Sequence, residues 1–176
     1  VTLLVSATIA LTLGRCKPGN FVRAMLPVFA VAISTQSSLA SLPAMLGASR
    51  RLGVREATAD FVLPLAVAIF RATSPAMNMG VAIYAAHLTG TPLSFWALGA
   101  GVLVAFLVSL SSVSLPGTLS FVVSVGPIAM AMGVPIEPLA LLVAVEMLPD
   151  IMRTLGNVTA DVAVTAAVDR RGAEKA

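Results

Sequence analysis

One short segment near the C-terminus holds most of the polar side chains that could do chemistry in an otherwise apolar chain. Its polar residues are Glu146, Asp150, Arg153, Thr154, Asn157 and Asp161. On a helix these six fall within one sector of about 100°, whereas Ile151 and Met152 fall outside it. Ionisable groups inside a membrane are costly, so they face a cavity or pair with one another. The pattern predicts a ligand site or, alternatively, an internal ion-pair ladder that only fastens helices.

The ligand-site interpretation gives each of these groups a chemical task. The Arg153 guanidinium would bind a carboxylate through two parallel hydrogen bonds, and Asp150 would pair with a ligand ammonium. Asp161 and Asn157 offer hard oxygen atoms to a cation. Two polar clusters, "STQSSLASLP" (34–43) and "SLSSVSLPG" (109–117), would supply hydroxyls and free backbone N–H groups at helix N-termini. The alternative for the second cluster is a small-residue packing surface.

The composition indicates an integral membrane protein. Of 176 residues, 58% are hydrophobic and 11% are charged, whereas soluble domains carry about 25% charged residues. The single Cys16 excludes an internal disulfide, and the lone His87 has no partners at metal-ligand spacing. The sequence contains no pair of a nucleophile and a base that would indicate an enzyme. The basic residues gather between apolar stretches, which indicates membrane topology rather than nucleic-acid binding.

The distribution of Lys and Arg predicts how the apolar stretches cross the membrane. The loops at 87–95 and 133–138 contain no basic residue, whereas 15–23, 47–56 and the C-terminus are basic. The positive-inside rule then places those three basic regions in the cytoplasm. All three basic regions can lie on the cytoplasmic side only if the stretches between them return to the side from which they entered. This predicts two re-entrant helical hairpins that enter from opposite faces, which is an inverted repeat typical of secondary transporters. The fold class is therefore all-α integral membrane. Because the chain starts with Val1 inside an apolar stretch, we expect a preceding N-terminal part.

Three motifs resemble those of the dicarboxylate/amino acid:cation symporter family, which includes the glutamate and aspartate transporters. "SSLASLP" (37–43) resembles the serine-rich tip of the family's first hairpin, and "SVSLPG" (112–117) the tip of its second. "DIMRTLGNVTAD" (150–161) resembles the signature of the last helix. The resemblance implies most of a mobile, elevator-type transport domain over 1–168. Its elements would be the end of helix six (1–15), hairpin one (18–52), an interrupted helix seven (56–88), hairpin two (93–132) and helix eight (136–168), followed by a cytoplasmic tail (169–176).

The resemblance also implies roles for individual residues. Substrate-binding residues would be Ser37, Ser38, Ser74, Pro116, Gly117, Asp150, Arg153, Thr154 and Asn157. Among them, Ser38 and the backbone near Pro116 and Gly117 would hold the main-chain carboxylate. Asp150 would hold the amino group, and Arg153 the side-chain carboxylate. Ser112, Asn157 and Asp161 would belong to a cation site for sodium, the one metal that the resemblance implies.

Helix seven departs from the family pattern. Members carry Asn-Met-Asp-Gly-Thr at its break, where this chain has "FRATS" (70–74). We hypothesise that the Arg71 guanidinium is a tethered cation that occupies the place of sodium and pairs with Asp161. Coupling would then be to protons, with Glu146 as a candidate proton carrier, or would be absent. The alternatives for Arg71 are an extra substrate clamp and a snorkelling residue.

The predicted function is secondary active transport of an acidic amino acid, aspartate or glutamate, across the inner membrane of the cell. Joint presence of Asp150 and Arg153 favours such a substrate, because dicarboxylate carriers of the family lack the acid and neutral amino-acid carriers lack the arginine. The alternatives are a symporter of C4-dicarboxylates or other carboxylates and a non-transporting ligand-binding paralogue. The expected partners are the acidic substrate, membrane lipid and the N-terminal scaffold helices, in a homotrimer at full length. No cofactor besides sodium or a proton as coupling ion is predicted.

Overall fold

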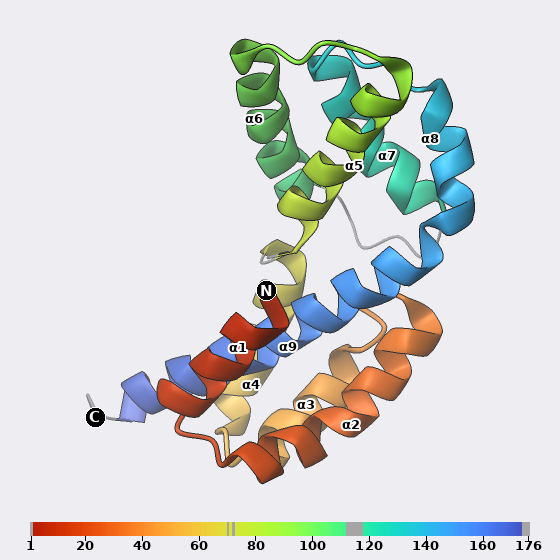
Figure 1. Ribbon diagram of the computed structural model, residues 1–176. Coiled ribbons are helices and arrows are strands. Elements are labelled where there is room, and N and C mark those ends of the chain that lie inside the picture. The colour runs from red at the N-terminus through yellow and green to blue at the C-terminus, as the bar shows by residue number, and fades with distance from the viewer. Residues whose placement is uncertain (1, 70, 72, 112–117, 174–176) are drawn as a thin grey trace. The chain divides into compact units, whose positions relative to one another are not determined.

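The computed structural model describes residues 2–69, 71, 73–111 and 118–173, in which helices occur and no strand is found (Figure 1). The predicted all-α class is therefore confirmed for the described residues. The re-entrant hairpins, the inverted repeat and the division into transport domain and tail stay predictions. The elements are α1 (Thr2–Thr12), α2 (Pro18–Thr35), α3 (Leu42–Arg51), α4 (Glu56–Ile69), α5 (Ser74–Thr89), α6 (Phe95–Ser111), α7 (Thr118–Ala131), α8 (Glu137–Leu142), the 3₁₀ turn η1 (Val143–Val145) and α9 (Met147–Ala173).

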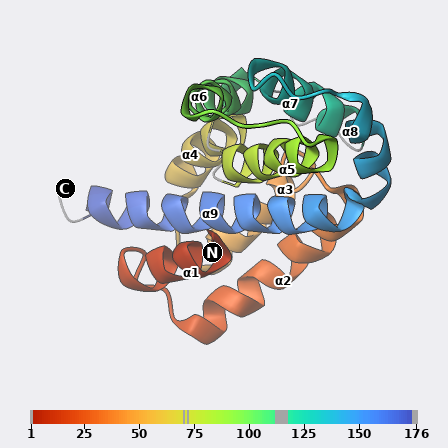
Figure 2. The same cartoon turned by 45° about the horizontal axis from the view of Figure 1, so that its top comes forward.

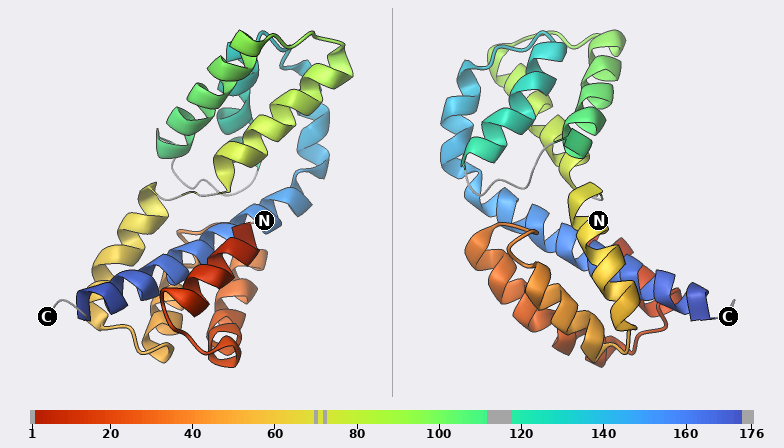
Figure 3. Two further views of the ribbon diagram at one scale, coloured as in Figure 1. Left: turned by 60° about the vertical axis from the view of Figure 1, so that its left-hand side comes forward. Right: turned by 180° about the vertical axis from the view of Figure 1, so that it is seen from behind.

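The chain divides into two compact units, of which unit 1 comprises 1–72 and 154–176. In it α2 and α3 lie side by side (Figure 3), and α1 runs along the C-terminal part of α9 (Figure 2). The helix α2 begins with Pro18, whose missing N–H costs no hydrogen bond in a first turn. The core of unit 1 includes side chains that are fully buried: Met25, Val28, Met45, Leu63, Val158 and Val162.

Unit 2 comprises residues 73–153 and contains α5, α6, α7, α8, η1 and the first turns of α9. The helices α5, α6 and α7 pack against one another around a second core. Its fully buried members include Ala82, Phe121, Val125 and Ile128. The helix α5 ends at Gly90, whose φ of 65° is a left-handed conformation that costs glycine little.

The sequence predicts an interrupted helix at 56–88 and a continuous helix at 136–168, and both are interrupted in the structure. In the predicted helix at 56–88, α4 ends at Ile69 and α5 begins at Ser74. The predicted helix at 136–168 is divided by η1, and Glu146 lies between η1 and α9 rather than on α9. Pro149 accounts for this second break, because a proline ring clashes with the carbonyl four residues earlier and allows a helix only to begin nearby.

The helices differ in whether their length and composition would allow them to cross a membrane. Among the described residues, α4 and α5 taken together, over Glu56–Thr89, are the one stretch that is long and apolar enough to cross a membrane by length and composition. Shorter apolar helices lie at Thr2–Thr12, Phe95–Leu110 and Phe121–Ala131. The helices at Phe95–Leu110 and Phe121–Ala131, which lie in the predicted hairpin two, are shorter than the roughly 20 residues that a simple span needs.

Asp169 ties the last turns of α9 to the beginning of α4 within unit 1. Its Oδ1 accepts hydrogen bonds from Arg55 Nε and from the Thr58 hydroxyl, each at 2.7 Å. Arg55 Nη2 also donates to the Asp169 carbonyl at 3.3 Å. Burial raises the pKa of Asp169, but the hydrogen bonds from Arg55 and Thr58 outweigh burial and lower this pKa below its ordinary value. The helix consequently continues to Ala173, through residues predicted as a tail.

Replacing Asp169 with asparagine is expected to lower the free energy of unfolding by about 1 kcal/mol, because Arg55 is half exposed and water screens the pair. The pKa is lowered in the folded state, so this stabilisation is present above the ordinary pKa of a carboxyl group. It is lost as the pH falls through the lowered value. Thermal unfolding of the detergent-solubilised protein should therefore differ between wild type and variant at about pH 7 and converge once the pH lies below the lowered pKa of Asp169.

The matched control for this experiment is Glu56→Gln. Glu56 pairs with Arg50 at 3.1 Å, and both side chains are more than half exposed. Such a pair contributes little, so its removal should leave the unfolding temperature unchanged. Equal losses in the two variants would show that Asp169 is no more than another surface charge.

Candidate functional site

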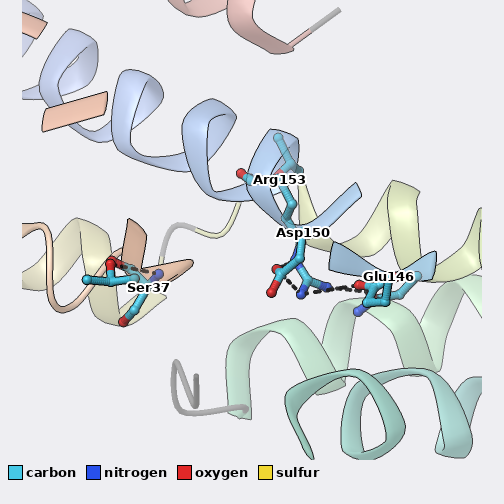
Figure 4. A network of polar contacts seen from close by, with 7 residues as sticks. Ser37, Glu146, Asp150 and Arg153 are labelled. Atoms are coloured by element: carbon cyan, nitrogen blue, oxygen red, sulfur yellow. Dashed lines mark hydrogen bonds and ion pairs between the residues drawn. The ribbon is translucent and has the colours of Figure 1, made fainter. Parts of the chain in front are cut away.

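Arg153, on the second turn of α9, is the centre of a buried polar cluster in unit 2 (Figure 4). Its Nε donates to Asp150 Oδ1 at 2.9 Å, and its Nη2 contacts the same oxygen. Its Nη2 also lies 3.6 Å from Glu146 Oε1, which is an ion pair but too long for a hydrogen bond. The structure thus brings together three of the residues that the sequence placed in one polar stripe.

The charges in this cluster do not balance. When both are ionised, Glu146 and Asp150 carry two negative charges, and Arg153 is the one Arg or Lys between residues 73 and 153. All three side chains are buried, with exposed fractions of 5–7%. Burial of charged groups is costly unless each is paired and hydrogen-bonded. With both carboxylates ionised the cluster has a net charge of −1, and this form favours binding of a positively charged group.

Asn78, on α5, is a functional candidate that the sequence did not single out as a site residue. Its Oδ1 accepts a hydrogen bond from Arg153 Nη1 at 3.2 Å, and its side chain is 2% exposed. The Thr73 hydroxyl, just before α5, donates to the Arg153 carbonyl at 3.0 Å. These two contacts fix the guanidinium and the backbone of Arg153 from the beginning of α5. A polar amide one turn into an apolar helix is the signal that could have indicated Asn78.

Replacing Asn78 with leucine is expected to weaken binding of L-aspartate about tenfold, the cost of one hydrogen bond to a charged group. The leucine side chain has the same number and branching of heavy atoms, so its shape is similar although its volume is larger. Isothermal titration on the purified protein measures the dissociation constant, and Asn78→Gln should recover part of the loss because it restores the acceptor. Unchanged affinity in Asn78→Leu would show that Asn78 does not position the guanidinium for a ligand.

The other predicted residues of the last helix belong to unit 1. Thr154, Asn157 and Asp161 are all buried, whereas Met152 is 56% exposed. Both carboxylate oxygens of Asp161 are buried and accept no hydrogen bond from the described residues. An uncompensated buried carboxylate requires a cation or a proton. Arg71 is in the same unit, but it does not hydrogen-bond to Asp161 in the structure, so their pairing stays a prediction.

The tip between α2 and α3 places two predicted serines in buried positions of unit 1. Ser37 and Ser38 are 6% and 7% exposed. The Ser37 hydroxyl accepts a hydrogen bond from the backbone N–H of Ala40, and its carbonyl accepts one from the Ser41 hydroxyl. The chain enters this tip at Gln36, whose φ of 51° is rare for a residue other than glycine. Such strain is typical of functional loops.

Four further predicted positions lie at or beside the second tip and the break of helix seven. Ser112, Pro116 and Gly117 lie outside the described residues. Ser74 begins α5 in unit 2, is 2% exposed, and its hydroxyl has no hydrogen-bond partner among the described residues. A buried hydroxyl without a partner is suited to bind a ligand atom.

Comparison with known proteins identifies the family. The sequence model of the sodium:dicarboxylate symporter family matches residues 1–171. The chain is 32% identical to an excitatory amino acid transporter of Caenorhabditis elegans, over 82% of this chain and 28% of that protein. It is 31% identical to the proton/sodium-glutamate symport protein of Bacillus subtilis (strain 168), over 73% of this chain and 30% of that protein. It is also 31% identical to human excitatory amino acid transporter 2, over 84% of this chain and 25% of that protein.

These relatives are transporters and not enzymes, and the chain spans less than a third of the length of each. The resemblance carried by the hairpin tips and the last helix is confirmed by the match over nearly the whole chain. The chain belongs to the sodium:dicarboxylate symporter family.

Proposed function

We propose that this chain binds an acidic amino acid, aspartate or glutamate, as the substrate-carrying part of a secondary active transporter. Family membership implies a protein of the plasma membrane that transports small molecules. The names of two relatives refer to excitatory amino acids and to glutamate. Transport would follow an elevator-type movement of this domain against scaffold helices, in a trimer surrounded by lipid. The topology predicted above would place the C-terminus in the cytoplasm.

The internal pair of Asp150 and Arg153 is the observation that carries this proposal. All of the hydrogen bonds that join them run from the guanidinium to one carboxylate. An amino acid carries both an ammonium and a carboxylate, so it can open this pair and satisfy both partners. A plain dicarboxylate can satisfy Arg153 alone, and it would leave Asp150 buried without a cation. Charge matching at this pair therefore favours an amino acid over a plain dicarboxylate.

The remaining residues would complete the site around the substrate. Thr154 would assist Arg153, and Asn157 would contact substrate or cation. Ser38, with Ser37, would hold the main-chain carboxylate together with the backbone near Pro116 and Gly117. Ser74 would offer its buried hydroxyl.

Coupling of transport to a cation is supported by the family and by the proton/sodium-glutamate relative. We propose that Asp161 is the main ligand of the coupled cation. The buried, unpartnered oxygens of Asp161 fit a bound cation, which Asn157 and Ser112 would help to hold. In the tethered-cation form of the proposal, the Arg71 guanidinium neutralises Asp161 instead, and Glu146 would carry a coupled proton. Unchanged uptake and unchanged ion dependence in Arg71→Ala would exclude the tethered cation.

A second candidate, a dicarboxylate symporter, is favoured by the description of the family itself. Uptake of labelled L-aspartate and of labelled succinate into proteoliposomes that hold the full-length protein separates the two. We expect L-aspartate to be taken up and succinate to be taken up far more slowly. The reverse preference would support the dicarboxylate carrier, and binding of L-aspartate without uptake would indicate a ligand-binding paralogue.

The same assay decides the coupling ion. Uptake is measured with a sodium gradient alone and then with a proton gradient alone. A strict requirement for sodium would show that Asp161 and Asn157 bind this ion and would contradict the tethered cation. Uptake that is indifferent to sodium and driven by protons would support it.

A further inference from the structure

Unit 2 contains a pocket that none of the proposed substrate contacts explains. Its volume is about 360 Å³, and the residues around it belong to α5, α7, α8, η1 and the start of α9. The walls are apolar except for one carboxylate, and they include Met77, Gly80, Tyr84, Phe121, Val145 and Glu146. Pockets of this size hold small organic molecules, with apolar walls for affinity and few polar groups for specificity.

Glu146 is the acidic residue at this pocket, and the negative charge of its ionised form is poorly compensated. The side chain is 7% exposed, and its Oε1 accepts no hydrogen bond from the described residues. Its ion pair with Arg153 is 3.6 Å long, and Arg153 makes its hydrogen bonds to Asp150 and Asn78 instead. Of the two carboxylates, the one that lines the pocket is therefore the one that Arg153 compensates less when both are ionised.

We propose that this pocket binds an organic monoammonium compound with an apolar substituent, whose ammonium pairs with Glu146. The apolar part would occupy the space between α5 and α7, where Met77 and Phe121 provide contacts. The Tyr84 ring, also in the lining, would add a cation–π contribution. This site lies beside the substrate position proposed for Asp150 and Arg153 but is separate from it, so it does not depend on the identity of the transported substrate.

The probe is 2-phenylethylammonium, compared with the neutral alcohol 2-phenylethanol, which has a similar shape. Binding is measured by isothermal titration on the full-length protein in lipid nanodiscs. We expect the ammonium compound to bind about tenfold more tightly than the alcohol, the difference that one charge-assisted hydrogen bond makes. In Glu146→Gln the two affinities should become equal. Equal affinities in the wild type would overturn the proposal.

Gly80 allows an independent test that leaves the charges unchanged. A Cβ atom added at Gly80 meets no heavy atom within 4 Å, so a leucine there extends into the pocket without a backbone clash. In Gly80→Leu the affinity for both probes should fall about tenfold or more. In Gly99→Leu both affinities should equal those of the wild type. Gly99 is a matched control, because it is also helical, has the same open space around an added Cβ atom and does not line the pocket. Unchanged binding in Gly80→Leu would overturn the proposal.

Competition distinguishes this site from the substrate site. Saturating L-aspartate should leave the affinity for 2-phenylethylammonium the same or higher. An ammonium bound to Glu146 draws this carboxylate away from Arg153, and the guanidinium is then freer to bind the carboxylate of L-aspartate. The two ligands would therefore assist each other or bind independently. Direct competition would mean that the probe binds Asp150, and it would overturn the proposal without affecting the proposed function. Conversely, a protein that binds the probe and fails to bind L-aspartate would overturn the proposed function alone.

Discussion

Replacing Arg153 with alanine should abolish measurable binding and uptake of L-aspartate, a loss of at least about 100-fold in affinity. The guanidinium is the group that the structure offers to a ligand carboxylate within unit 2, since Arg153 is the one Arg or Lys between residues 73 and 153. The same change should also destabilise the protein by about 3–5 kcal/mol, because Glu146 and Asp150 lose their cation while they stay buried.

Two further variants separate the loss of binding from the loss of stability. Arg153→Lys keeps the charge but cannot form two parallel hydrogen bonds, so it should keep most of the stability and lose most of the affinity. In Arg153→Ala combined with Glu146→Gln, one buried charge is removed, so part of the stability should return while binding stays absent. Thermal unfolding in detergent and titration with L-aspartate measure the two effects. Full affinity in Arg153→Lys would show that Arg153 does not bind the ligand carboxylate.

The polar face of the last helix could be predicted from the sequence because helical periodicity is a local property. Asp150 and Arg153 lie one turn apart, and their ion pair follows from this spacing alone. The burial of Thr154, Asn157 and Asp161 follows from the same face of α9. The periodicity also predicts Glu146 on this helix, whereas in the structure Glu146 precedes α9. Periodicity takes no account of Pro149, which restricts where the helix can begin.

The long-range contacts could not be predicted in the same way. Asn78 lies 75 positions before its partner Arg153, and a single sequence contains no local signal for such a pairing. The link between Arg55 and Asp169 spans 114 positions and is unpredictable for the same reason. Asp169 is also an acidic residue near the C-terminal end of a helix, where the helix dipole disfavours it, so its stabilisation depends on residues elsewhere in the chain.

Replacing Asp150 with asparagine should change which substrate is preferred rather than remove binding altogether. The affinity for L-aspartate should fall about 100-fold, because the ligand ammonium loses a buried counter-charge that contributes about 3 kcal/mol. The affinity for succinate should stay the same or increase. The neutral amide oxygen competes less strongly with the ligand carboxylate for Arg153 Nε and Nη2, and with Glu146 ionised the cluster changes from a net charge of −1 to zero.

Titration of the variant with L-aspartate and with succinate measures this change, and Glu137→Gln is the matched control. Glu137 is the remaining acidic residue of unit 2 and is exposed at the start of α8, so its removal should affect neither substrate. If both substrates lost affinity equally in Asp150→Asn, Asp150 would act only as the partner that orients Arg153. Charge matching at this pair would then not explain a preference for amino acids, and the dicarboxylate carrier would become the better interpretation.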